Sequence, residues 1–584
     1  MFSIQGIRKT LLLKHQISTK QNSSPLMFKI FLFQTKQIFQ PLGFQGKKKK
    51  DQYLLDSFGK PKDESFDFEN IEKYFQKKDQ QNVHQILSDK ICQDLDLDMF
   101  IDRTHSHVGQ QYLYDALRCI KINEEQTQLN EKLIAEFIKN ATFRVSIQEQ
   151  LEKLKNKHSY SITTLFQEEH IRPPRWFNII KLLSLLSLVS LLLSIFNPKF
   201  FIAFLAIFCI NFVLHYWNKN NLSKYVNAIP ELLRLNHVAS HLFSNPLLKS
   251  LNPELQNSMK IINGVKNRMS FFKLEAKLQG EFEIIAWFFF EIVKTIFLFE
   301  PLLLFGVLNR LHTRRAEIEE VFCYVGKVDM LLSIASVREG TEQYCLPNIT
   351  KDASISIQDM YHPLIVNCTK NSVGLANKSI LLTGSNMSGK TFLIRSIGLN
   401  IITGLTINTC FAKAMEFPLL KLYSAIRISD DLLNNKSYYF EEVLTVKEML
   451  QKSNTGGIHL FLLDEIFKGT NTVERISAGK AVLSELSKNN NKVLVSTHDI
   501  ELADLLSNEY ELYHFSETVS DQTVGFDYKL KPGKLKNRNA IRILEINGYP
   551  KEVVQEAYAI SKEMDKTISK QTSPTIPRTK KGTT

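Results

Sequence analysis

Residues 378–399, which read KSILLTGSNMSGKTFLIRSIGL, constrain the fold of this chain more than any other stretch. A short apolar run comes first, a loop of small residues follows, and apolar residues with helical spacing come after the loop. The loop matches G-x-x-x-x-G-K-[ST], the phosphate-binding P-loop. A chance match in a glycine- and serine-rich turn would lack the strand before the loop and the helix after it. The sequence therefore predicts a nucleotide site here.

The residues of this loop have expected roles in holding phosphate. Gly384 and Gly389 let the backbone curl so that its N–H groups face phosphate oxygens, and the following helix turns its positive end toward them. Lys390 would reach the outer phosphates, and the Thr391 hydroxyl would bind Mg²⁺. The candidate cofactors are therefore ATP and Mg²⁺. The candidate nucleotide-binding residues of the loop are Gly384, Ser385, Asn386, Met387, Ser388, Gly389, Lys390 and Thr391.

Two later stretches end in residues suited to hydrolysis. Residues 458–472 (IHLFLLDEIFKGTNT) contain an apolar strand that ends in Asp464 and Glu465, the Walker B arrangement. Asp464 would hold Mg²⁺ through water, and Glu465 would orient and deprotonate the attacking water. Residues 492–499 (KVLVSTHD) predict another strand, whose final His498 would face the ligand crevice and sense the γ-phosphate. A purely structural histidine is the alternative. The catalytic candidates are Glu465, His498 and Lys390, and the metal-binding candidates are Thr391 and Asp464.

Length and composition set wider limits. At 584 residues the chain is too long for a single hydrophobic core, so two or more domains are expected. The net charge of +13 permits a polyanionic partner or an anionic membrane surface, without choosing between them. The seven cysteines are scattered and form no C-x-x-C pair. This pattern disfavours a zinc site or a disulfide framework and favours a reducing compartment.

The two ends of the chain have biased compositions. Residues 1–50 contain no Asp or Glu, and Arg8 is their only arginine. A transit peptide is one interpretation, but a disordered basic arm, or translation starting at Met27, is favoured. We therefore treat residues 1–75 as a basic N-terminal extension that is partly disordered. Residues 566–584 are rich in Ser, Thr, Pro and Lys, and are expected to form a disordered basic tail.

Two long apolar runs interrupt the first half of the chain. Residues 182–198 carry no charge, and residues 200–217 contain only Asn211 and His215 as notably polar groups. Each run approaches the length of about 20 residues that crosses a bilayer. An Asn-Pro-Lys break between them predicts a transmembrane hairpin at residues 177–217. Positive charges gather outside the hairpin, which places both flanks and the nucleotide site in the cytoplasm. Two helices buried in a large soluble core are the alternative.

A third apolar stretch, residues 284–308, has a different character. Glu291, Lys294 and Glu300 interrupt it, and Pro301 breaks it. Charged side chains are costly inside a bilayer, so a buried pair of core helices is favoured over another span. After residue 340 the pattern changes to strands that alternate with helices up to about residue 561. That alternation predicts an α/β sheet flanked by helices.

The spacing of the motifs resembles a known group of ATPases. The short interval from Glu465 to His498, with one helix between, is similar to ATPases of the ABC superclass, but the transporter signature L-S-G-G-Q is absent. GSNMSGKT resembles the GPNMGGKS of the MutS family of mismatch-repair ATPases, DEIFKGTNTVER resembles DE-x-G-R-G-T-S-T-x-D-G, and STHD resembles A-T-H-Y. SYYFEEV at 437–443 is similar to S-T-F-M-x-E-M. Weaker likeness to the family's helical core and levers extends the resemblance to residues 90–560.

The resemblance implies a multidomain α + α/β fold. A helical core and lever domain would occupy residues 76–350 and contain the hairpin, and a P-loop ATPase domain of the ABC superclass would occupy residues 351–565. It also implies a homodimer with composite ATP sites and binding of double-stranded DNA. Thr470, Asn471 and Thr472 of one subunit would reach the γ-phosphate held by the other.

Some positions depart from the family pattern. Asn471 replaces a serine and Glu474 replaces an aspartate. Arg542 stands where mismatch-repair members place an adenine-stacking histidine, and it becomes the candidate adenine contact because a guanidinium can stack on a base. Those members also carry an N-terminal domain with a Phe-x-Glu wedge and a connector domain, for which no room is expected before a core that begins near residue 90. Residues 166–168 match Phe-x-Glu, and we interpret the match as coincidence.

These observations lead to competing hypotheses. The leading one is a membrane-associated, MutS-like ATPase of the DNA-damage-sensor type that lacks the mismatch-recognition domain. It would be anchored by two spans, with its ATPase domain in the cytoplasm. The alternative is a membrane-bound mechanochemical ATPase that acts on a protein or lipid partner without binding DNA. Transport is disfavoured because the transporter signature is missing and the predicted spans are too few.

Overall fold

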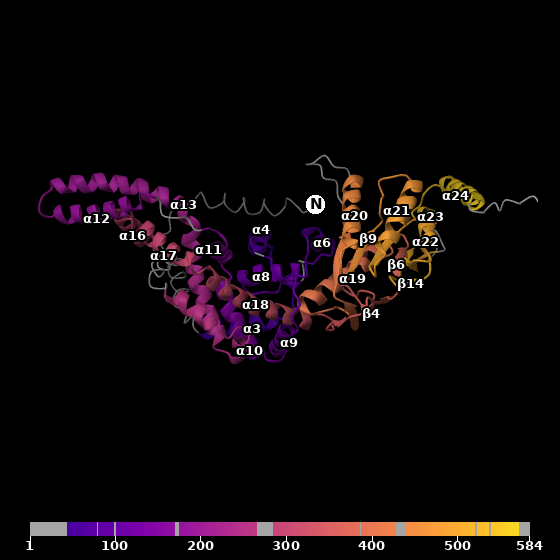
Figure 1. The fold of residues 1–584 in the computed structure, drawn as a ribbon, viewed down its shortest axis with the longest axis horizontal. Coiled ribbons are helices and arrows are strands. Elements are labelled where there is room, and N and C mark those ends of the chain that lie inside the picture. Colours follow the sequence, from indigo (N-terminus) through magenta and orange to yellow (C-terminus); the bar gives the residue numbers. More distant parts are fainter. Residues whose placement is uncertain are drawn as a thin grey trace, which may run out of the picture. The chain divides into compact units, whose positions relative to one another are not determined.

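The computed structural model describes residues 44–78, 80–97, 101–169, 175–264, 284–385, 387–427, 438–519, 523–535 and 539–571. The chain divides into two units, residues 1–58 and residues 59–584. In the first unit the structure describes one helix, α3 (Phe44–Ser57). The basic segment before residue 44 lies outside the described residues. Both the helical region and the nucleotide domain belong to the second unit (Figure 1).

Several helices of the second unit begin at a side chain that caps them. In each case a Ser or Asn oxygen accepts the backbone N–H of the residue three positions on, which satisfies one of the free donors of a helix start. The capping residues and their helices are Ser88 for α6 (Asp89–Asp94), Ser106 for α8 (His107–Arg118), Asn123 for α9 (Glu124–Lys139) and Asn140 for α10 (Ala141–Leu151).

The long helix α18 (Arg315–Glu339) packs against α8 and α9. Asp329 of α18 is fully buried, and it accepts the backbone N–H groups of His105 and Ser106, each at 2.8 Å. Gly109 of α8 allows this approach, since a Cβ there would lie 2.1 Å from Asp329 Oδ2. The helices therefore meet at a glycine through hydrogen bonds to a buried carboxylate.

The helical domain begins earlier than expected. Tyr74, in the short helix α5 (Lys73–Gln76), is fully buried and lies against Phe166 and Phe322, with ring centroids 6.1 and 4.9 Å away. Through this aromatic contact, residues ahead of the boundary predicted after residue 75 also contribute to the helical core. Phe166 is a core residue, as expected if its Phe-x-Glu match is coincidental.

The two apolar runs of 177–217 form paired helices. Helix α12 (Phe177–Leu193) packs against α13 (Lys199–Phe243), which continues for 45 residues and contains Pro230. Within the described residues, one segment is both long and apolar enough to cross a membrane: Lys199–Trp217, with 17% of its most apolar window buried. Helix α12 is apolar but shorter. The outer side chains of both helices are therefore mostly exposed.

The stretch expected to be a pair of core helices forms α16 (Ile284–Phe297) and α17 (Phe299–His312). Leu298 separates them with a left-handed φ of +48°. Helix α16 packs against both α12 and α13. Ser184 Oγ donates to Phe297 O at 2.7 Å, and Asn211 Nδ2 donates to Ile296 O at 2.8 Å. The polar groups of the apolar hairpin thus satisfy carbonyls at the end of α16.

Buried charges join the same helices. Lys294 Nζ lies 2.7 Å from Glu291 Oε2 and 3.3 Å from Glu300 Oε2, and His215 Nε2 lies 3.1 Å from Glu291 Oε1. All four side chains are buried. The charges that argued against a span in this stretch therefore compensate one another.

The C-terminal part is built on a six-stranded sheet with strand order β14-β11-β6-β10-β9-β8. Strands β6, β9 and β14 are labelled in Figure 1. Neighbouring strands of the sheet run parallel, except that β14 is antiparallel to β11. The strands are β6 (Ser379–Thr383), β8 (Leu420–Ala425), β9 (Ile458–Asp464), β10 (Lys492–Thr497), β11 (Tyr510–His514) and β14 (Lys531–Pro532). The prediction of an α/β sheet is confirmed.

A smaller sheet and several helices complete this region. The second sheet has the order β3-β7-β4-β5, with β3 (Asn348–Thr350), β4 (Ile355–Met360), β5 (Asn371–Leu375) and β7 (Ala414–Pro418). Helices that contact the main sheet are α19 (Lys390–Ile407), α20 (Tyr438–Ser453), α21 (Thr472–Leu486) and α22 (Ile500–Leu506). The chain then forms α23 (Ala540–Ile546) and α24 (Lys551–Gln571). Helix α24 continues six residues past 565, where the disordered tail is predicted to begin.

Candidate functional site

The P-loop connects β6 to α19, as the sequence predicts. Gly384 has a φ of +151° and Gly389 a φ of +106°, values that side chains disfavour. At Gly384 a Cβ would also lie 2.7 Å from Ser388 Oγ and 2.9 Å from Phe515 O. Ser388 Oγ closes the loop by donating to Ser385 O at 2.7 Å. Asn386 lies outside the described residues.

Lys390 is buried at the start of α19, inside the loop. Its Nζ donates to Gly384 O and to Ser385 O, both at 2.8 Å. Burial lowers the pKa of Lys390 to about 8, although nearby Glu465 and Asp464 raise it. A phosphate within reach of this ammonium would favour its charged form. Lys390 is therefore placed for the role expected of it.

A hydroxyl and a carboxylate meet beside the loop. Thr391 Oγ1 donates to Asp464 Oδ2 at 2.8 Å, and Ser496 Oγ donates to Asp464 Oδ1. Parallel pairing of β9 with β10 sets Asp464 opposite Ser496. Mg²⁺ prefers such oxygen ligands and is often held by only one or two protein groups. No cluster of three or more His, Cys, Asp or Glu that could hold a metal occurs in the part of the chain that the structure describes. Thr391 and Asp464 therefore suit Mg²⁺, and Ser496 is a partner that the motifs did not reveal.

Glu465 and His498 meet at the ends of neighbouring strands. Glu465 has a left-handed φ of +54°, and its N–H donates to Ser496 O at 3.0 Å. Its Oε1 lies 2.7 Å from His498 Nε2, and its Oε2 lies 3.0 Å from Lys468 Nζ. Burial alone would raise the pKa of Glu465, but hydrogen bonds with His498 and Lys468 lower the pKa to about 2. The carboxylate is well oriented, but it is a weak base while both partners hold it.

The loop after Glu465 has a strained backbone. Phe467 is buried and has a φ of +60°, which is unfavourable for an aromatic residue. Its N–H donates to Glu442 Oε1, and its ring lies 6.4 Å from that of Tyr439 in centroid distance. Burial raises the pKa of Glu442, although the bond from Phe467 lowers it. Tyr439 and Glu442 therefore hold the loop that follows the acid pair in place. Both belong to the stretch 437–443, which was identified only by its resemblance to the family. Residue 437 itself is outside the described residues.

The loop predicted to act across a dimer caps its own helix. Asn471 Oδ1 accepts the N–H of Glu474 at 3.0 Å, and Asn471 Nδ2 donates to Glu474 Oε2 at 2.7 Å. Thr470 Oγ1 donates to the same carboxylate oxygen at 3.0 Å. Asn471 and Thr472 are exposed. Asn471 and Glu474, which both depart from the family pattern, therefore bind each other at the start of α21.

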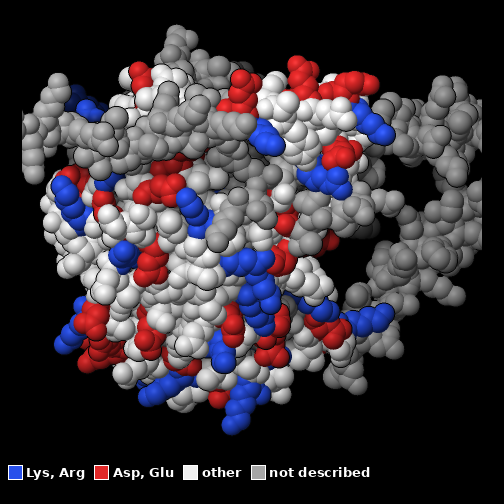
Figure 2. All heavy atoms as spheres, turned by 90° about the vertical axis from the view of Figure 1, so that its right-hand side faces the viewer, with Lys and Arg blue, Asp and Glu red and all other residues white. Residues whose placement is uncertain are grey.

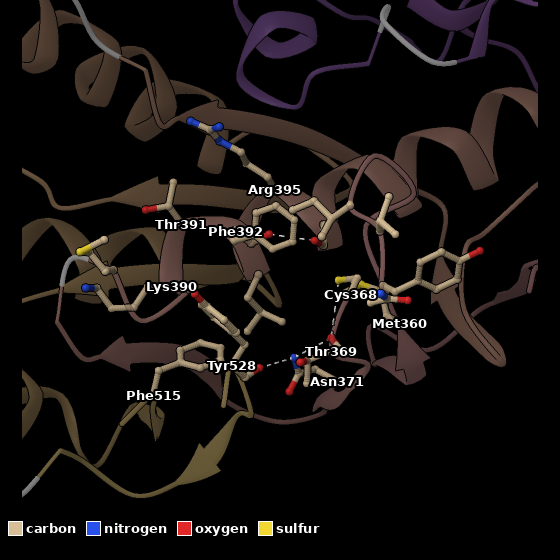
Figure 3. Close-up of a pocket in the computed structure, with 18 residues that line it drawn as sticks. Met360, Cys368, Thr369, Asn371, Lys390, Thr391, Phe392, Arg395, Phe515 and Tyr528 are labelled. Carbon is tan, nitrogen blue, oxygen red and sulfur yellow. Dashed lines mark hydrogen bonds between the residues drawn. The ribbon is translucent and has the colours of Figure 1, made fainter. Parts of the chain in front are cut away.

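A cavity of about 510 Å³ opens beside the P-loop (Figure 3). Lys390 and Thr391 line one part of its wall, and residues 365–369 line another. Phe392, Phe515 and Tyr528 add aromatic rings. The size lies within the range of about 300–1,000 Å³ that is usual for ligand sites. The cavity can therefore receive a planar base next to the phosphate loop, and Tyr528 is a site residue that sequence reasoning missed.

Arg542 is not among the residues that line this cavity. It lies on α23, and its Nη1 is 2.6 Å from Glu545 Oε2 in the same helix. The prediction that Arg542 contacts adenine is therefore not supported by its position in this structure. The aromatic position next to the loop is taken by Tyr528, which lies close to Gly389.

The surface at this end of the chain has mixed charge. In Figure 2, basic side chains are interspersed with acidic ones over the visible face. Although the chain has a net charge of +13, its basic side chains do not form one continuous surface on the described part of this face.

Known proteins resemble the part of the chain that contains this site. The family description MutS domain V matches residues 380–565. The DNA mismatch repair protein MutS of Aquifex pyrophilus is 30% identical over 259 residues, which cover 42% of this chain and 30% of that protein. The protein of the same name from Methanosarcina barkeri is 28% identical over 275 residues, covering 44% and 30%. The chain thus spans about 30% of the length of these relatives.

Tyr528→Ala should weaken ATP binding about 2- to 13-fold, because an aromatic contact with a ring contributes ~0.5–1.5 kcal/mol. Tyr528→Phe keeps the ring and should bind as the unchanged protein does. Arg542→Ala, whose side chain is outside the cavity, serves as the matched control and should also bind normally. Titration with a fluorescent ATP analogue measures all three. Weakened binding by Arg542→Ala together with normal binding by Tyr528→Ala would contradict this placement of the base.

Proposed function

Because this chain belongs to the MutS family through its C-terminal domain, we propose that it is a Mg²⁺-dependent ATPase that works as a homodimer on double-stranded DNA. We further propose that residues 177–217 anchor it in a membrane, with the ATPase domain in the cytoplasm. The observation that carries the ATPase proposal is the convergence of Lys390, Asp464 and the Glu465–His498 pair at one edge of the sheet.

Each side chain has a role in this proposal. Lys390 binds the outer phosphates, while Thr391 and Asp464 hold Mg²⁺, which supplies positive charge against the phosphate oxygens. Glu465 accepts the proton of the attacking water, and His498 orients that carboxylate. Hydrogen bonds with His498 and Lys468 lower the pKa of Glu465 to about 2, so the carboxylate is charged and free of a proton when water arrives.

The dimer proposal is supported by the position of the loop at 470–472. These residues do not line the cavity, and Asn471, Thr472 and Val473 are exposed at the start of α21. A helix start carries partial positive charge and free N–H groups, which suit the γ-phosphate of a second copy. The loop would therefore complete the site of the other subunit.

The exposure of large apolar side chains on α12 and α13 supports the membrane proposal. Outward-facing residues of α12 and α13, such as Leu188 and Val213, are large and apolar yet exposed, and such a surface is unusual for a helix of a soluble core. Trp176 and Trp217 lie together at the base of the hairpin, with ring centroids 5.4 Å apart. Paired tryptophans at one level are typical of the interface between lipid and water.

DNA is proposed as the partner because the similar proteins are named DNA mismatch repair proteins. The alternative is a membrane-bound mechanochemical ATPase that acts on a protein or lipid partner. The specific observation in its favour is the apolar hairpin, which sits within the helical region. Binding of the purified protein to duplex DNA, weakening as salt rises, separates the two functions.

Glu465→Gln should retain ATP binding but slow hydrolysis at least 100-fold, because the amide cannot accept a proton from water. Phosphate release in the presence of Mg²⁺ measures turnover, and a fluorescent ATP analogue measures binding. Glu552→Gln, at an exposed position in the first turn of α24, is the control. Turnover at the normal rate in Glu465→Gln would show that another group is the base.

A mixture of Lys390→Ala and Asn471→Ala subunits should recover about one working site per heterodimer, although neither variant should be active alone. The heterodimer combines an intact P-loop from one subunit with an intact loop from the other. Asn471→Ser retains a capping side chain and should be active, which separates loss of the cap from loss of the contact across the dimer. Confirmed subunit exchange without recovered activity would exclude the composite site.

The double substitution Leu188→Lys and Val213→Lys should move the protein from the membrane to the soluble fraction, because each charge costs ~3 kcal/mol in the hydrocarbon core. Leu505→Lys, at an exposed position of α22, is the control and should leave the distribution unchanged. Fractionation followed by immunoblotting measures both. Unsubstituted protein that stays soluble without detergent would rule out the anchor.

A further inference from the structure

Arg475 and Asp499 join helix α21 to the segment that carries His498. Arg475 Nε lies 2.9 Å from Asp499 Oδ2, and Nη2 lies 2.7 Å from Oδ1. Two parallel bonds of this kind fix both distance and orientation. The side chains are 25% and 13% exposed. The proposed mechanism of hydrolysis uses neither residue.

The Asp499 side chain binds Arg475 and does not cap its own helix, α22. It occupies the N-cap position of α22 with an extended backbone, where an aspartate ordinarily accepts an N–H from the first turn. Its side chain makes no such bond. Both carboxylate oxygens are directed to Arg475, while its own N–H donates to Thr497 Oγ1 at 3.0 Å. The arrangement serves the contact between elements rather than the helix that Asp499 starts.

Arg475 belongs to a turn that is itself held together. Its N–H donates to Asn471 O at 2.9 Å in the first turn of α21. Glu474 accepts from both Thr470 and Asn471 in that turn. The loop at 470–472 and the Arg475 guanidinium are therefore parts of one hydrogen-bonded unit.

We infer that the Arg475–Asp499 pair is a positioning device that couples the loop at 470–472 to the Glu465–His498 pair of the same subunit. The inference rests on the proposed function, in which this loop engages the nucleotide of a second copy. The pair holds Asp499, and with it the adjacent His498, at a set position relative to α21. A shift of the first turn of α21 is then passed through the guanidinium to His498 and on to Glu465.

This connection gives the dimer a defined route between its two sites. Contact of the loop with nucleotide on one subunit changes the orientation of the base on the other.

The test compares Arg475→Gln, Asp499→Asn and the double variant in the full-length protein. Each single substitution should lower kcat for ATP hydrolysis about 10- to 100-fold, as expected for a misplaced catalytic group, with KM for ATP within about twofold. The double variant should be no slower than the slower single variant, because one unit is removed in all three. Lys480→Gln is the matched control: it breaks the ion pair between Lys480 of α21 and Glu509 and should leave kcat unchanged.

Hydrogen exchange provides a readout that does not require hydrolysis. Without nucleotide, Asp499→Asn should increase exchange at residues 496–500, and Lys480→Gln should not. Normal kcat and unchanged exchange in both single variants, or losses of kcat that multiply in the double variant, would overturn the inference. An unsubstituted protein without ATPase activity would refute the proposed function instead, and the exchange measurement would still decide whether the pair positions this segment.

Discussion

In-register pairing of parallel strands is the constraint on which the nucleotide site depends. Strand β10 lies between β6 and β9, so the P-loop, the acid pair and His498 all leave the sheet at the same edge. Thr497 is opposite Thr383, and Ser496 is opposite Asp464. A slip of one residue in either pairing would turn the side chains to the other face of the sheet. The contacts among Thr391, Asp464 and Ser496 therefore follow from strand register as much as from the motifs.

Features encoded within a few neighbouring residues were predictable from the sequence. The P-loop, the acid pair and the parallel strands around them are local patterns, and the structure places Lys390, Thr391, Asp464, Glu465 and His498 together as expected. Ser496 and Tyr528 escaped prediction because their roles arise from strand pairing and from a loop far along the chain. Arg542 was predicted from the resemblance alone, and it does not line the cavity because matching a position in a motif does not show where its helix lies.

In the helical region, too, contacts between distant residues could not be predicted from the sequence. Composition alone identified two apolar helices and a third apolar stretch with charges. It did not show that Lys294 would lie between Glu291 and Glu300, or that His215 would join them. Those contacts depend on how α16 meets α13, which no local pattern specifies. The early start of the helical core has a similar cause, since Tyr74 becomes a core residue only through distant aromatic partners.

Helix α13 runs without interruption from the tip of the hairpin into the helical region, where it packs against α18. At 1.5 Å per residue, its 45 residues extend for roughly 68 Å. Arg338, near the end of α18, binds Glu131 of α9 at 2.6 Å and donates to Asn408 O and Thr409 Oγ1, just beyond α19. A long helix held at one end converts a small rotation into a larger sideways displacement at the other. A tilt of a few degrees where Arg338 of α18 binds residues 408 and 409 would therefore move the apolar tip by several ångströms.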